Sequence, residues 1–396
     1  MDKKKLLYAL AGLGGVAAWL IFILACTGWP AWSPDGSKVL FILSSPDPKS
    51  KDSAVALYDR GAGSATALYS YRTSTHDMTP MAQFSRDGRQ AILVLNRNDD
   101  QPTEVLSLPL EGRKPVLHVT LPGTKGVMLA PFPEIGGELY MGSDFIYRMN
   151  LATGDLKIKK LTEGEGILLM GDGDPVWYAV FEIERPGHED KGMQFGRLNR
   201  DDLSLKPYFE FWDADQQKLG IEGFNGVTLT PEPGGAHLLV AAYVDHKPVL
   251  VLFGKSGVDR IIKPEFPTDC RIASLAWSAD GKAIYAALLA PGANKAEQNL
   301  VIAETSPGGG QVRLDAVLTM AKTKDLVDTA ESAMGLSLSP DGRTLAISTG
   351  LLPPDSLKSE QDRALFLIDL TDPARKVTRI AAPALPKVAV TRAAKE

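Results

Sequence analysis

Four aspartates recur in one short sequence context, and repeated carboxylates are side chains that can bind divalent metals or act in acid–base catalysis. Each stands two positions after a serine and directly before a glycine: Asp35, Asp87, Asp280 and Asp341. The same context is typical of a type I turn, in which the aspartate accepts hydrogen bonds from nearby backbone amides. Because the copies lie far apart in the chain, we interpret these aspartates as turn residues rather than as a metal or catalytic set.

Other residues with chemical potential are scattered. The chain has five histidines, and no H-E-x-x-H, G-x-S-x-G, phosphate-loop or C-x-x-C motif accompanies them. His118 and His237 fall in expected strands, which favours structural roles, and the GDGD stretch at 171–174 lacks the other ligands of a calcium loop. Cys270 lies beside an apolar strand and is expected to be a buried, unpaired thiol. The sequence therefore predicts no catalytic residue, no metal and no cofactor.

The turn aspartates belong to an internal repeat. Its four clear copies are WSPDGSKVLFIL from Trp32, FSRDGRQAILVL from Phe84, WSADGKAIYAAL from Trp277 and LSPDGRTLAIST from Leu338. A weaker copy, LTPEPGGAHLLVAAY from Leu229, is interpreted as carrying one extra turn residue. Two degenerate copies are expected within VMLAPFPEIGGELYMG from Val127 and ILLMGDGDPVWYAVF from Ile167. A spacing of roughly 50 residues then gives seven units.

Each unit contains four expected strands, most clearly the last, with GLSLS, TLAIST, ALFLIDL and KVTRIAA. Four-stranded units of this length predict an all-β fold, a seven-bladed β-propeller over residues 29–382, with six or eight blades as alternatives. Residues 383–396 are expected to form a C-terminal tail. Trp32, Phe84 and Trp277 share one repeat position and are expected to be buried between blades.

The S-P-D-G motif, followed by a basic or polar pair and an apolar run, resembles the repeat of TolB-type, WD-repeat-like β-propellers. The resemblance covers residues 29–382 and implies the propeller fold, but it says almost nothing about function. We expect neither the α/β domain that precedes the propeller in TolB nor the hydrolase domain of prolyl-oligopeptidase-like enzymes.

The N-terminus, residues 1–26, has the pattern of a membrane-targeting segment. Three lysines precede residues 6–25, which carry no charge and are long enough to span a bilayer as a helix. The lysines predict a cytoplasmic N-terminus and a propeller on the extracytoplasmic side, periplasmic or extracellular. Ile-Leu-Ala-Cys26 also resembles a lipoprotein box, so an uncleaved transmembrane helix and a signal lipidated at Cys26 both stay open.

Loop lengths indicate where binding is expected. The expected turns between first and second strands and between third and fourth strands are short, and they define the short-turn face. The other connections define the long-loop face and are mostly longer: 44–53, 72–81, 96–102, 182–194, 211–226, 290–299, 318–335 and 350–363. We expect this face to bind partners and to receive the N-terminal segment. Candidate binding residues are Arg72, His76, Arg97, Arg185, His188, Trp212, His246 and Arg271, with Trp212 as the aromatic expected to be exposed.

Composition restricts the class of partner. The net charge is -5 and the pI about 5.7, so nothing in the sequence favours nucleic acid. We hypothesise a membrane-tethered, exported propeller that acts as a non-catalytic protein-interaction scaffold, its partner an envelope or membrane protein. The alternative is a propeller hydrolase or lyase with a carboxylate or metal site in the central channel.

Overall fold

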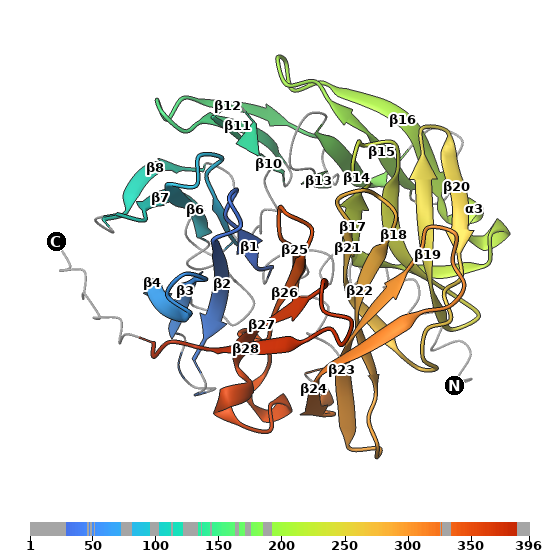
Figure 1. The fold of residues 1–396 in the computed structure, drawn as a ribbon. Helices are drawn as coiled ribbons and strands as arrows, with labels where there is room; N and C mark the ends of the chain where they lie inside the picture. Colours follow the sequence, from blue (N-terminus) through green and yellow to red (C-terminus); the bar gives the residue numbers. More distant parts are fainter. Residues whose placement is uncertain are drawn as a thin grey trace, which may run out of the picture.

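The fold is a ring of seven antiparallel, four-stranded sheets, seen down its axis in Figure 1. The computed structural model describes residues 29–45, 47, 50, 52–72, 81–95, 103–111, 114–121, 134–135, 137–142, 145–162, 166–170, 176–184, 192–324, 326 and 334–385. The predicted all-β, seven-bladed propeller is confirmed. Residues 6–25 and Cys26 lie outside the described part, and within that part no helix is long and apolar enough to cross a membrane.

Each blade is a meander of four consecutive strands. Blade 1 has β1 (Ala31–Trp32), β2 (Lys38–Ser44), β3 (Asp52–Asp59) and β4 (Ser64–Arg72), and blade 2 has β5 (Met81–Phe84), β6 (Gln90–Leu95), β7 (Glu104–Pro109) and β8 (Val116–Thr120). Blade 3 has β9 (Glu134–Ile135), β10 (Glu138–Gly142), β11 (Phe145–Asn150) and β12 (Leu156–Lys160). Blade 4 has β13 (Gly166–Met170), β14 (Trp177–Ile183), β15 (Gly192–Leu198) and β16 (Leu205–Trp212). The first two strands of blades 3 and 4 coincide with the degenerate repeat copies.

The remaining three blades follow the same order. Blade 5 has β17 (Ile221–Pro231), β18 (Leu238–Val244), β19 (Lys247–Gly254) and β20 (Gly257–Ile262). Blade 6 has β21 (Arg271–Trp277), β22 (Ile284–Pro291), β23 (Glu297–Thr305) and β24 (Arg313–Ala321). Blade 7 has β25 (Leu336–Leu338), β26 (Thr344–Ser348), β27 (Ala364–Asp369) and β28 (Val377–Ala381). Short helices lie in the connections: α3 (Asp213–Lys218), η1 (Pro354–Ser356) and η2 (Glu360–Asp362).

The middle strands of a blade are apolar along their length because another blade covers each of their two faces. In β2 and β3 the central residues are all buried, whereas in the outer strand β28 only Ile380 is buried. The resulting cores lie between blades. One core joins Val39 and Phe41 of blade 1 to Leu365 and Ile380 of blade 7. Burying each such side chain stabilises the fold by about 1.5–3 kcal/mol, so the ring is held mainly by these seams.

The ring closes between blades 7 and 1 without a shared strand, since each of these sheets is built from its own four consecutive strands. Polar contacts cross this seam: the Trp32 indole N–H donates to the Ser337 carbonyl at 3.3 Å, and the Ser44 N–H donates to the Gly350 carbonyl at 3.0 Å. The Arg363 guanidinium, only 5% exposed, donates from Nη1 to Ser44 Oγ at 2.9 Å and to the Gly350 carbonyl at 2.7 Å.

The repeated aromatic position lies at the seams, as predicted. Phe84 and Trp277 are buried, and Trp32 is partly buried. The Trp277 indole N–H donates to the Thr230 carbonyl of blade 5 at 3.3 Å, a bond to the preceding blade like that of Trp32. These two tryptophans therefore fix one blade against the next.

Candidate functional site

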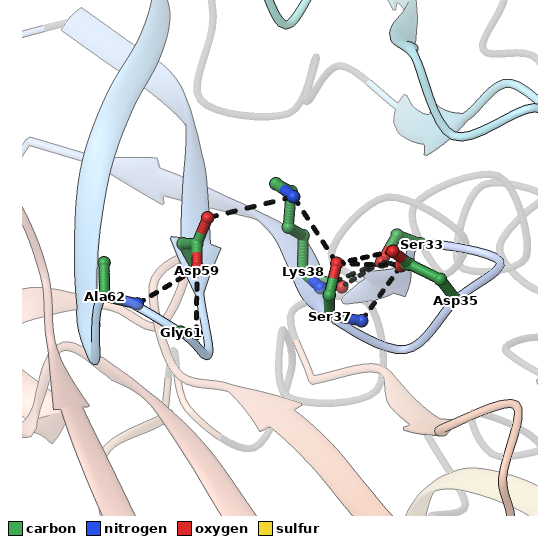
Figure 2. A network of polar contacts seen from close by, with 7 residues as sticks. All are labelled: Ser33, Asp35, Ser37, Lys38, Asp59, Gly61 and Ala62. Carbon is green, nitrogen blue, oxygen red and sulfur yellow. Dashed lines mark hydrogen bonds and ion pairs between the residues drawn. The ribbon is translucent and has the colours of Figure 1, made fainter.

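The S-x-D-G turns are hydrogen-bonded polar units, and in blade 1 the ion pair between Lys38 and Asp59 joins this unit to the β3–β4 turn (Figure 2). The Ser33 hydroxyl accepts the Lys38 N–H at 2.8 Å and donates to Asp35 Oδ1 at 2.6 Å. The same carboxylate accepts the Ser37 N–H at 3.0 Å. Asp59 closes the neighbouring β3–β4 turn in a similar way, accepting the Gly61 N–H at 2.8 Å.

The other three copies repeat this geometry. The serine-to-aspartate distances are 2.6 Å for Ser85–Asp87, 2.8 Å for Ser278–Asp280 and 2.5 Å for Ser339–Asp341. Two hydrogen bonds lower the pKa of Asp35 and of Asp280 to about 2. The larger effect comes from the serine hydroxyl, and the next from the backbone N–H of the residue two positions after the aspartate. The pKa values of Asp87 and Asp341 are lowered too, again mainly by the serine. The prediction that these aspartates serve the turns is confirmed.

The fifth turn, in blade 5, corrects the sequence alignment. The Glu232 N–H donates to the His237 carbonyl and the Gly235 N–H to the Glu232 carbonyl, which are the bonds that Ser33, Lys38 and Gly36 make in blade 1. The turn therefore has the ordinary length, and the prediction of an extra residue in it was wrong. Glu232 occupies the serine position, and its carboxylate lies 2.6 Å from His237 Nδ1 in place of the serine–aspartate pair.

Successive turns also pack against each other around the short-turn face. In each contact, a residue near the start of one turn lies against the turn glycine of the next blade. A Cβ added to that glycine would lie 3.4–3.8 Å from the contacting residue. The contacts are Pro34 on Gly88, Glu232 on Gly281, Ala279 on Gly342 and Pro340 on Gly36. These contacts run in one direction through blades 5, 6, 7, 1 and 2. In these five blades the short-turn face is thus packed from one turn to the next.

The long-loop face carries the predicted binding residues that the structure describes. Arg72 ends β4, where it lies opposite Asp52 in the backbone register, and Trp212 ends β16. His246 lies between β18 and β19, and Arg271 begins β21. They come from four different blades. His76, Arg97, Arg185, His188 and Cys26 lie outside the described residues.

Trp212 is not the exposed aromatic that was expected. It is 7% exposed because its indole ring lies against Gly192, the strand neighbour with which it pairs. A Cβ at Gly192 would approach ring atom Cε3 to 2.6 Å, so the ring occupies the space that the glycine leaves. Trp212 therefore belongs to the core between β16 and its neighbours.

His246 is exposed, but it does not lie in a long loop as expected. Asp245 and His246 form the tight turn between β18 and β19, with φ of 50° and 60°. Positive φ at both positions is the geometry of a type I′ hairpin turn, for which glycine or asparagine is the usual choice. The His246 side chain is 94% exposed, and its Nδ1 lies 2.9 Å from Glu222 Oε2.

Two further observations concern chemistry. Cys270 is buried, as predicted, and burial raises the pKa of its thiol to about 11, so the thiolate nucleophile is suppressed. In the described part of the chain, no group of three or more histidine, cysteine, aspartate or glutamate side chains is placed to hold a metal ion. Sequence reasoning missed the Glu232–His237 pair because these residues differ in type from the serine and aspartate of the other turns, and it missed Arg363 because that residue lies outside the repeated turn motif.

Trp29 shows where the chain enters the ring. Its indole lies directly on Gly335, leaving no room for a Cβ there, and Gly335 immediately precedes β25. First strands begin at the long-loop face, so residue 29 reaches the ring on that face. At the other end, Leu385 packs against the core between blades 7 and 1, beyond the predicted boundary at 382.

Comparisons with known proteins support the fold alone. No protein-family model matches the chain, and no curated protein matches it. The β-propeller domain of the Trilobed protease from Pyrococcus furiosus, described as having an open velcro topology, is 10% identical, with 92% of this chain and 99% of that chain covered and a TM-score of 0.55. A putative 6-phosphogluconolactonase from Bacteroides uniformis is 15% identical, with 88% and 97% covered and a TM-score of 0.52. TolB from Acinetobacter baumannii is 14% identical, with 70% and 65% covered and a TM-score of 0.42.

Proposed function

We propose that this chain is a membrane-tethered, exported β-propeller that acts as a non-catalytic scaffold and binds an envelope or membrane protein through its long-loop face. The observation that carries the proposal is the contact of Trp29 with Gly335. It supports a geometry in which the apolar residues 6–25 attach on the same side as the long connections. A tether on that side would hold those connections close to the bilayer and to proteins within it.

The two faces also differ in what they offer a partner. The carboxylates of the S-x-D-G turns are engaged with their own serines and amides. On the long-loop face, the tight turn at His246 presents a side chain that is 94% exposed and is positioned by Glu222, 2.9 Å from its Nδ1. Rigid scaffolds that present variable connections are a common basis for protein binding.

Photo-crosslinking tests the proposal directly. A benzophenone amino acid at position 246 of the full-length chain, expressed in intact cells, is expected to capture a membrane or envelope protein. The matched control is position 62, exposed in the short β3–β4 turn on the opposite face. Equal capture at both positions, or capture only at 62, would refute the assignment of the binding face.

The enzyme alternative has a separate readout. A stoichiometric divalent metal in the purified full-length chain, together with turnover of an ester, lactone or peptide substrate that a chelator abolishes, would favour the central-channel hydrolase or lyase. The scaffold proposal predicts neither result.

A further inference from the structure

The outer edges of the blades are not equivalent. Each blade ends in an outer strand, and in five of them, β4, β8, β16, β20 and β24, the pairing with the neighbouring strand shifts register at a bulge. Bulges twist an edge and hinder the addition of a further strand. β12 and β28 pair without any shift. These two strands are therefore the regular edges of the ring.

The free hydrogen-bonding groups of β12 follow from its pairing with β11. The Asn150 N–H donates to the Asp155 carbonyl at 2.9 Å. In an antiparallel pair, bonded and non-bonded positions alternate, so Lys157 and Lys159 are the residues whose backbone bonds to β11. The N–H and C=O groups of Leu156, Ile158 and Lys160 consequently point away from the blade, at the outer rim visible in Figure 1.

The side chains of β12 give this edge a definite chemistry. Ile158 is 40% exposed and is one of the few large hydrophobic residues exposed in the described part of the chain. Lys157 and Lys159 project from the other side of the strand. Lys157 Nζ donates to the backbone carbonyl of Asp201 at 2.6 Å. The pKa of Asp202 is lowered mainly by hydrogen bonds from Ser204 and further by the nearby charge of Lys159. Three lysines thus accompany one exposed apolar side chain along a regular edge.

The second regular edge, β28, lacks this combination. Its large aliphatic residue, Ile380, is buried, and the guanidinium of Arg379 donates to Gln361 Oε1 at 3.2 Å. The Asp369 N–H donates to the Lys376 carbonyl, so every second residue of β28 counted from Lys376 bonds to β27. The N–H of Arg379 therefore points outward, and β28 offers a backbone edge similar to that of β12. It is therefore a matched internal control.

We propose that β12 is a docking edge for an extended, acidic segment of a partner protein, which adds to blade 3 as a fifth strand. Directly opposed residues of adjacent strands share a face of the sheet. Acidic residues of the partner would lie opposite Lys157 and Lys159, with an apolar residue between them opposite Ile158. Backbone bonds supply affinity in this mode and side chains supply specificity. The edge is separate from the long-loop face, so this proposal stands or fails independently of the proposed function.

The test uses a fluorescein-labelled peptide of alternating glutamate and valine, and the same peptide with lysine in place of glutamate, titrated onto the full-length chain. The glutamate peptide is expected to bind at least tenfold more tightly at low salt. Its binding should slow hydrogen exchange at the amides of residues 156, 158 and 160. Equal affinity for the two peptides, or no protection at these amides, would overturn the proposal.

Two variants separate strand addition from nonspecific charge attraction. Ile158→Pro removes an outward N–H without removing a bond to β11, and it should weaken binding at least tenfold. Arg379→Pro makes the same change on β28 and should leave binding unchanged. The double variant Lys157→Glu, Lys159→Glu keeps the backbone intact and should reverse the preference between the peptides. Wild-type affinity in Ile158→Pro, or an unchanged preference in the double variant, would contradict the docking edge.

Discussion

Replacing Arg363 by alanine should destabilise the seam that closes the ring. The guanidinium donates to Ser44 Oγ, to the Ser44 carbonyl, and to the carbonyls of Gly350 and Leu352, at 2.7 to 3.3 Å. A hydrogen bond from a charged donor contributes about 1.5–3 kcal/mol, so the two shortest together give about 3–6 kcal/mol. Removing a buried charge recovers part of its desolvation cost, which leaves an expected loss of about 2–4 kcal/mol in the free energy of unfolding.

Urea unfolding of the full-length chain at pH 7, followed by tryptophan fluorescence, measures this loss. Arg379→Ala, on the exposed side of β28, is the control and should change the free energy of unfolding by no more than about 0.5 kcal/mol. Arg363→Lys should fall between the two, because a single ammonium group cannot bridge both blades as the planar guanidinium does. If Arg363→Ala is as stable as Arg379→Ala, the guanidinium does not hold the seam.

Two further predictions concern the turns and the other seams. Because the folded-state pKa values of Asp35 and Asp280 are lowered to about 2, the stability they contribute is complete above about pH 4 and is lost as the pH falls toward 2. Urea midpoints at pH 7 and pH 3 should therefore differ less in the double variant Asp35→Asn, Asp280→Asn than in the wild type, and an unchanged difference would rule out this role. Trp277→Phe should cost about 1–3 kcal/mol in the free energy of unfolding, since it removes the 3.3 Å bond to Thr230 and part of a buried ring. Urea unfolding at pH 7 measures this, and a loss below about 0.5 kcal/mol would show that packing at the seam does not depend on the indole.

The fold was predictable because its information is local and repeated. Turn chemistry at Asp35, Asp87, Asp280 and Asp341 marks four blades, and the regular spacing is enough to find the degenerate first strands of blades 3 and 4. The alignment failed in blade 5, where a glutamate–histidine pair closes the turn that serine and aspartate close elsewhere. Repeat patterns therefore give the blade number more reliably than the register within one blade.

The candidate site was harder to predict because exposure depends on neighbours distant in sequence. Trp212 is buried because its ring fills the space that Gly192 leaves. The position of His246 follows from positive φ angles at Asp245 and His246, in a turn without glycine. Arg363 meets Ser44 from a strand connection at the other end of the chain. None of these contacts has a periodic signature.

The closure of the ring has a consequence for how such a chain can be rearranged. Since every blade is one uninterrupted stretch of sequence, new chain ends introduced between any two blades would leave all seven sheets with their own four strands. Each blade likewise corresponds to a single segment of sequence, bounded by the two seams that flank it. Which blade comes first and which comes last is therefore set by the order of the chain and not by the pairing of strands within any sheet.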